Sequence, residues 1–143
     1  MFMTESDLVA IDLTEDERLL MLHGLNEYWG SAARADTLMA PLVGLSTTGE
    51  FDALIGRLKD AIGGRVPLSN LDWARALFLT EISWASDVVG SGLDFATNIR
   101  DERAAPLLRS IQRKVSTYER FVLLRDSARA VAGGPAAGGA TTT

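Results

Sequence analysis

Apolar side chains recur three and four positions apart in several separate segments of this 143-residue chain. The clearest segment is residues 51–62, whose apolar members are Phe51, Leu54, Ile55, Leu58 and Ile62. An α-helix turns about 100° per residue, so this spacing places all five side chains on one helical face. The period therefore predicts an all-α protein.

Capping signals delimit the expected helices. Thr14 with Glu17, and Thr47 with Glu50, form capping boxes, in which each partner accepts a hydrogen bond from the other's backbone N–H. The expected helices are residues 14–30, 36–43, 47–62, 70–89 and 103–124. The fourth is the most apolar and is expected at the centre. We expect a compact bundle of four main amphipathic helices plus one short helix.

The two ends of the chain differ from the middle. Residues 1–13 contain a β-compatible run, but no second strand pattern is evident for it to pair with, so we expect an extended arm. Residues 131–143 are almost entirely Gly, Ala and Thr, a composition that cannot offset the entropy of ordering. The sequence thus predicts an N-terminal arm (1–13), one helical domain (14–130) and a disordered C-terminal tail (131–143).

Composition excludes several classes of site. The chain has no Cys and one His, which excludes disulfides, thiolate metal sites and any site that needs two imidazoles. Neither a nucleophile elbow nor a phosphate loop is present. No apolar run approaches the roughly 18 residues that a membrane span needs. The first residues carry acidic side chains where a signal peptide would carry positive charge, so the sequence does not predict a signal peptide. We expect a cytoplasmic protein that is not an enzyme and holds no metal or cofactor.

Charge is distributed unevenly along the chain. Residues 1–36 hold eight acidic and two basic residues, whereas residues 100–143 hold four acidic and eight basic ones. On the expected last helix Arg109, Arg113 and Arg120 lie opposite the apolar stripe, which predicts an exposed basic ridge about 16 Å long. The net charge of −5 opposes binding to nucleic acid. The ridge favours an acidic protein partner or the acidic first helix of a second copy.

The fourth helix carries three further candidates. Trp73 and Trp84 flank a polar stripe, which is typical of tryptophans at the edge of a core but also of partner anchors. Glu81 falls inside the apolar arc and is expected to be buried. A buried carboxylate must be paired or protonated, so Glu81 is either a structural ion pair, with Arg18 as one partner, or a tuned acid/base in a pocket.

Residues 38–58 resemble a helix-turn-helix. Residues 38–46 would form the first helix and turn, and the second helix would turn Phe51, Leu54 and Leu58 to the core. The resemblance implies a DNA-binding regulator whose recognition helix is residues 49–62. The segment departs from the motif in two ways. Pro41 lies inside the first helix, and the second helix carries the acidic residues Glu50, Asp52 and Asp60.

The sequence thus leads to three hypotheses. The first is a non-enzymatic helical module for protein–protein contact, such as an adaptor, an immunity- or antitoxin-type partner, or a subunit of a small assembly. The second is a degenerate helix-turn-helix regulator. The third is a helical small-ligand binder or enzyme that uses Glu81.

Overall fold

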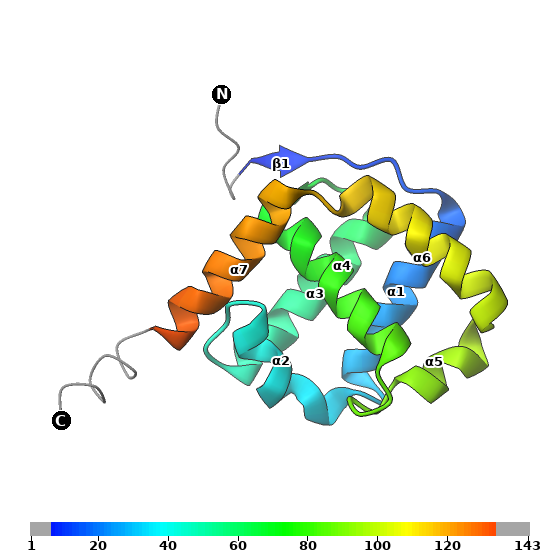
Figure 1. The fold of residues 1–143 in the computed structure, drawn as a ribbon, viewed down its shortest axis with the longest axis horizontal. Helices are drawn as coiled ribbons and strands as arrows, with labels where there is room; N and C mark the ends of the chain where they lie inside the picture. Colours follow the sequence, from blue (N-terminus) through cyan, green and yellow to red (C-terminus); the bar gives the residue numbers. More distant parts are fainter. Residues whose placement is uncertain (1–6, 134–143) are drawn as a thin grey trace.

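The computed structural model describes residues 7–133. Two short strands, two 3₁₀ turns and seven α-helices follow one another in this part of the chain (Figure 1). The expected all-α class is confirmed, with seven α-helices in place of the five expected. In chain order the elements are β1 (Leu8–Val9), α1 (Glu15–Asn26), η1 (Glu27–Trp29), η2 (Ala33–Ala35), α2 (Asp36–Leu42), α3 (Thr48–Gly64), β2 (Leu68–Ser69), α4 (Asn70–Ala85), α5 (Gly92–Asn98), α6 (Asp101–Val115) and α7 (Tyr118–Ala132).

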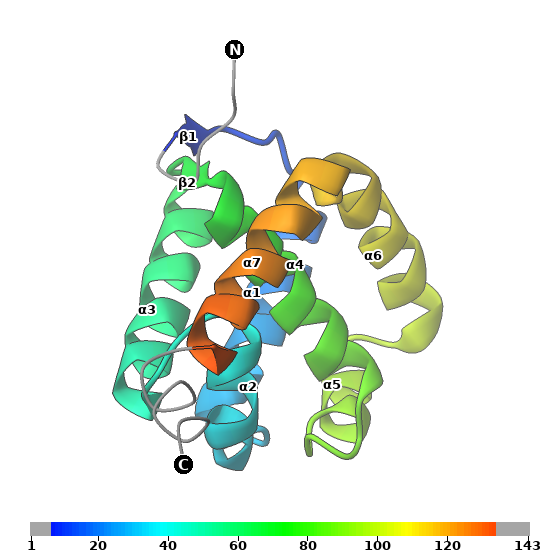
Figure 2. The same cartoon turned by 60° about the vertical axis from the view of Figure 1, so that its left-hand side comes forward.

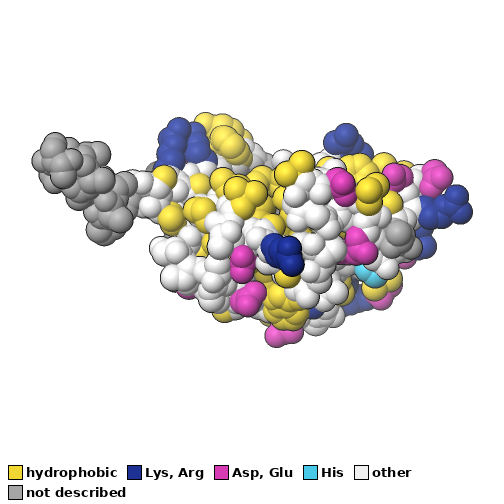
Figure 3. Space-filling model, turned by 90° about the horizontal axis from the view of Figure 1, so that it is seen from below, with side chains coloured by type: hydrophobic (Ala, Val, Ile, Leu, Met, Phe, Trp, Pro, Cys, Tyr) yellow, Lys and Arg dark blue, Asp and Glu magenta, His cyan; other side chains and the backbone are white. Residues whose placement is uncertain are grey.

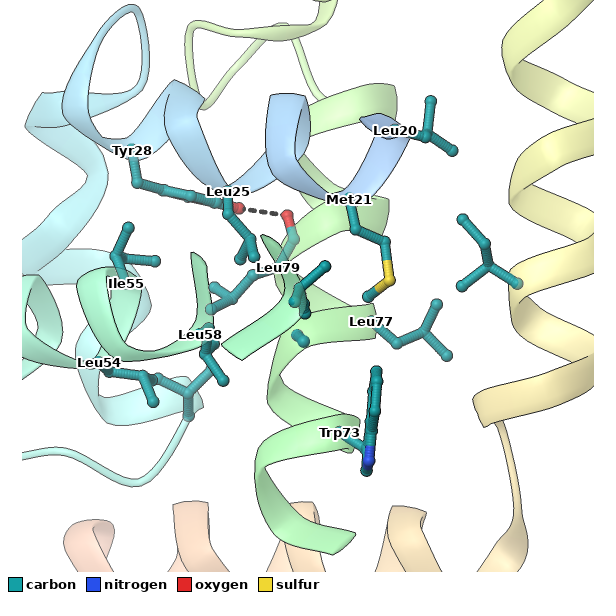
Figure 4. Close-up of a cluster of buried hydrophobic side chains, with 14 of the residues drawn as sticks. Leu20, Met21, Leu25, Tyr28, Leu54, Ile55, Leu58, Trp73, Leu77 and Leu79 are labelled. Carbon is teal, nitrogen blue, oxygen red and sulfur yellow. Dashed lines mark hydrogen bonds between the residues drawn. The ribbon is translucent and has the colours of Figure 1, made fainter. Parts of the chain in front are cut away.

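Helices α1 and α4 form the centre of the bundle. α1 packs against α3, α4 and α6, while α4 also contacts α5, α6 and α7. α3 and α6 lie on opposite sides of this central pair (Figure 2). The side chains that fill the space between α1, α3 and α4 are almost completely buried (Figure 4), among them Met21, Leu25, Leu54, Ile55, Leu58 and Leu79, while Leu20 points toward α6. The central position expected for the fourth helix is confirmed.

Both expected capping boxes are present. The Thr14 hydroxyl accepts from the Glu17 backbone N–H at 3.1 Å, and the Glu17 carboxylate accepts from the Thr14 N–H at 2.7 Å. Thr47 and Glu50 repeat the arrangement at the start of α3. These ends were predictable because every atom involved lies within one helical turn of the chain.

The N-terminal arm has a partner, which the sequence analysis did not find. Leu8 and Val9 pair antiparallel with Leu68 and Ser69. The Trp73 indole N–H fixes the arm further by donating to the Val9 carbonyl at 2.8 Å. The expectation of an unpaired arm was therefore wrong. The sequence did not reveal the pairing because two residues on each side are too few to leave an alternating apolar–polar pattern.

The expected last helix is two helices. Thr117 starts α7, because its hydroxyl accepts from the Arg120 backbone N–H at 3.1 Å. The change of direction turns the Arg120 side chain inward, where it donates to the Asn70 side chain and to the Val115 carbonyl, both at 3.0 Å. Arg120 is only 7% exposed, so the expected exposed ridge is wrong at this residue. Tyr118 is exposed, although in the sequence it continues the apolar spacing of Ile111 and Val115.

Three further differences from the expected helices concern α4, α5 and α7. α4 ends at Ala85 rather than at residue 89, and Val88 beyond it lies in solvent. The segment expected as a loop contains α5, which Phe95 anchors in the core. α7 continues to Ala132, beyond the expected domain end at residue 130. Residues 134–143 of the expected tail lie outside the described part of the chain.

None of the described helices is long and apolar enough to cross a membrane.

Candidate functional site

A groove follows the outer side of α4, between α6 and α7. It consists of two hollows that adjoin at Glu81, which lines both. The first hollow, of about 170 Å³, lies between α4 and α7 and is lined mainly by Leu77, Phe78, Thr117, Arg120, Phe121 and Leu124. The second, of about 200 Å³, lies between α4 and α6 and is lined by Trp84, Ala85, Ala105, Leu108, Arg109 and Gln112. We call these two hollows together the α4 groove.

The break between α6 and α7 creates this groove. Because the chain turns at Ser116 and Thr117, α6 and α7 lie on either side of α4 instead of covering it as one continuous rod (Figure 1). Apolar side chains on this side of α4, Phe78 and Ile82, are therefore only partly buried. Phe121 at the start of α7 is 54% exposed. The result is an apolar surface that the rest of the described chain leaves open.

Glu81 lies where the two hollows adjoin and is half-buried rather than fully buried, and a donor from another helix meets it, as expected for a carboxylate within the apolar arc. The Gln112 side-chain amide donates to its carboxylate at 2.6 Å, and Arg109 donates to the amide oxygen of Gln112 at 2.9 Å. Arg18, the partner considered for Glu81, donates instead to the Ile62 and Leu13 carbonyls. Glu81 is open because it sits where α6 and α7 diverge.

The structure separates the two candidate tryptophans. Trp84 is partly buried and lines the second hollow, where its indole N–H has no acceptor among residues 7–133. Trp73 is 3% exposed and donates to the Val9 carbonyl, so it is a core residue that holds the arm. Four of the six candidates from the sequence therefore meet at the α4 groove: Glu81, Trp84, Arg109 and Arg120.

Basic residues of α6 neutralise the acidic start of α1. The Lys114 ammonium lies 2.6 Å from Glu17, and Arg103 lies 3.1 Å from Asp16. Burial alone would raise the pKa of Glu17, but donors from Lys114, Ser110 and the backbone lower its pKa to about 2. Two of the acidic residues near the N-terminus thus pair with basic residues of the C-terminal third within one chain. Arg113 is exposed on α6, outside the groove.

The segment that resembles a helix-turn-helix corresponds to α2 and α3. Both basic residues in the middle of α3 are engaged within the fold: Arg57 pairs with Asp72, and Lys59 lies 4.2 Å from the centre of the Trp29 ring and donates to Asn26. The exposed residues of α3 include Asp52 and Asp60. The face seen from below carries apolar, acidic and basic side chains intermixed (Figure 3). These features do not favour an approach to phosphates.

The groove combines apolar walls with a few polar groups. It presents the Glu81 carboxylate and the exposed Arg109 side chain, whereas the indole N–H of Trp84 is buried and has no acceptor among residues 7–133. In the described part of the chain, no group of three His, Cys, Asp or Glu side chains could hold a metal ion. Sequence reasoning missed Gln112 and Phe121, although the Ser116–Thr117 pair was a visible capping signal that would have exposed the break.

Comparison of the chain with protein-family models, with curated proteins and with solved structures finds no match.

Proposed function

We propose that this protein is a non-enzymatic interaction module that binds an amphipathic helix of a partner protein in the α4 groove. The observation that carries the proposal is the open, mainly apolar groove with one carboxylate at its centre, where the two hollows meet. Monomeric proteins seldom leave contiguous apolar surface open without a use for it.

The spacing of the hollows supports a helical occupant. Phe78 lines the first hollow and Ala85 the second, and they lie seven residues apart on α4. Seven residues of helix span about 10 Å. Apolar side chains at positions i and i+7 of a partner helix have the same separation, which is the usual anchor pattern of helix-in-groove recognition.

The polar groups indicate the charge of the partner. Among the described residues, the Gln112 amide alone donates to Glu81, and the carboxylate is partly open to solvent. Glu81 forms no ion pair with a described cation, so it can pair with a Lys or Arg between the apolar anchors, while Arg109 and Arg120 line the hollows on either side of it. The proposed partner helix therefore has two apolar anchors with a basic residue between them.

Two synthetic helical peptides test this proposal. Both carry Leu anchors at i and i+7; one has Lys between them and the other Glu. We expect the Lys peptide to quench or shift tryptophan fluorescence on binding, and the Glu peptide to bind about tenfold more weakly, because like charges repel in the groove.

A matched pair of variants controls for non-specific attraction to an acidic protein. Glu81→Gln and Asp52→Asn each remove one negative charge, but Asp52 lies on α3, outside the groove. Glu81→Gln should abolish the preference for the Lys peptide, and Asp52→Asn should retain it. Equal loss in both variants would refute the proposal.

A further inference from the structure

A separate cavity of about 270 Å³ lies where the N-terminal arm passes the start of α1 and the end of α3. Apolar side chains form most of its lining, among them Ile11, Ile62, Val66 and Pro67. Two guanidinium side chains, Arg18 and Arg65, line the same cavity. A cavity with this lining suits a small molecule that is apolar on one side and negatively charged on the other.

Arg18 is a buried cation whose described partners are neutral. It is 7% exposed, and its terminal nitrogens donate to the backbone carbonyls of Ile62 at 3.1 Å and Leu13 at 2.8 Å. Its Nε atom is buried and has no acceptor within residues 7–133. No ion pair joins Arg18 to a described carboxylate. The Arg18 side chain lines the cavity, and its guanidinium can bind a carboxylate through two parallel hydrogen bonds once the side chain turns its Nε–H, which is shielded from solvent in the structure, toward the cavity.

Arg65 brings a second positive charge to the cavity. Its backbone has φ of 59°, in the left-handed region that a residue other than glycine rarely adopts. Its side chain pairs with Glu15 at 3.2 Å, and both side chains are about two-thirds exposed, so this pair can exchange readily. Asp12 is the one acidic residue that lines the cavity, which leaves the lining with a net charge of +1.

We infer that this cavity binds a small monocarboxylate with a compact apolar body. The carboxylate meets the Arg18 guanidinium with Arg65 beside it, and the apolar body contacts Ile62, Val66 and Trp73. The mainly apolar lining disfavours inorganic phosphate, which would lose its hydration without a matching set of donors. This site is separate from the α4 groove and shares no lining residue with it.

Calorimetric titration with benzoate tests the inference, with benzamide as its neutral isostere and inorganic phosphate as a second control. We expect benzoate to bind with a Kd of about 1 mM or lower, and benzamide and phosphate to bind at least about tenfold more weakly. Arg65→Gln should weaken benzoate binding several-fold, and Arg18→Lys should weaken it more, because an ammonium cannot replace the guanidinium fork. Arg113→Gln, on exposed α6 surface, should leave it unchanged.

Nuclear magnetic resonance on the unaltered protein keeps the inference testable if an Arg18 variant does not fold. The Nε–Hε signal of Arg18 should move on adding benzoate and stay in place with benzamide. The inference is overturned if benzoate does not bind, if benzamide binds equally, or if the Arg18 signal does not move. The first result would show that the cavity takes no such ligand, the second that its arginines do not select a carboxylate, and the third that benzoate binds elsewhere on the protein.

Discussion

Lys114 Nζ lies 2.6 Å from Oε1 of Glu17, which ties the last turn of α6 to the first turn of α1. Glu17 is 1% exposed and also accepts from the Ser110 hydroxyl and the Thr14 backbone. The acidic start of the chain and its basic C-terminal third therefore stabilise each other within one molecule.

Acid should weaken the fold through Glu17. Its pKa in the folded protein is about 2, below the ordinary 4.5, because the hydrogen bonds from Lys114, Ser110 and Thr14 outweigh the opposing effect of burial. The folded state thus binds the proton less readily, so this stabilisation is full above pH 4.5 and is lost as pH falls towards 2. Lys114→Met should lower the free energy of unfolding by about 2 kcal/mol at pH 7, and by less at pH 3.

Urea denaturation at the two pH values measures this effect. Arg113→Met, at the neighbouring exposed position, is the control and should change the free energy of unfolding by less than about 0.5 kcal/mol. A Lys114→Met loss that is the same at both pH values would show that the ion pair does not stabilise the fold.

Glu27→Gln should stabilise the protein at alkaline pH. Burial raises the pKa of Glu27, and the nearby Asp94 carboxylate raises it further, although the Ser31 hydroxyl opposes both effects. A raised pKa means that the contribution of Glu27 is favourable at low pH and is lost as pH rises through its folded value. The variant removes the buried charge and keeps an acceptor for Ser31. Its thermal midpoint should exceed that of the parent at pH 8 and match it at pH 4; a lower midpoint at pH 8 would contradict this assignment.

Gly44→Ala should be strongly destabilising. The backbone of Gly44 has φ of +83°, and an added Cβ would lie 1.5 Å from the Ser127 hydroxyl oxygen, where α7 packs on the end of α2. We expect a loss of more than about 2 kcal/mol. Gly56→Ala, inside α3, meets only Trp29 at an ordinary 3.5 Å and should gain about 0.5–1 kcal/mol. A Gly44→Ala variant with the urea midpoint of the parent would refute this packing of α7 on α2, and a lowered midpoint for Gly56→Ala would refute the open space beside Gly56.

Phe121→Ser should separate binding from stability. Phe121 is 54% exposed at the α4 groove, so its loss should change the free energy of unfolding by less than about 0.5 kcal/mol while weakening the Lys peptide at least about fivefold. Leu38→Ser is the matched control, because Leu38 is similarly exposed, at 57%, on α2. Peptide titrations in which both variants weaken binding equally would mean that the peptide adsorbs to any exposed apolar residue.

The sequence predicted what depends on local interactions. Helix starts at Thr14 and Thr47 were predictable because their capping partners lie three residues away. The break before α7 was missed because the apolar residues Val115 and Tyr118 keep the three-to-four-residue spacing on both sides of it. Helical periodicity alone does not reveal a turn of the chain that leaves this spacing undisturbed. The burial of Arg120 depends on Asn70, 50 positions earlier in the chain. No local pattern encodes such a contact.

The candidate site was predictable in part for the same reason. Glu81, Trp84 and Arg109 stand out by residue type, and the structure brings them together. Whether Glu81 is covered depends on how α6 and α7 diverge, which is a tertiary property. Helical periodicity shows the face of α4 on which Glu81 lies, but it does not show what packs against that face.

Amide chemical-shift mapping with the Lys peptide tests the central claim, that the α4 groove is the binding surface. The account predicts shifts confined to the groove-lining parts of α4, α6 and α7, residues 74–85, 105–112 and 115–124, with α3 and the start of α1 unaffected. Shifts centred on the acidic surface of α3, or spread over the molecule without a focus at Glu81, would contradict it.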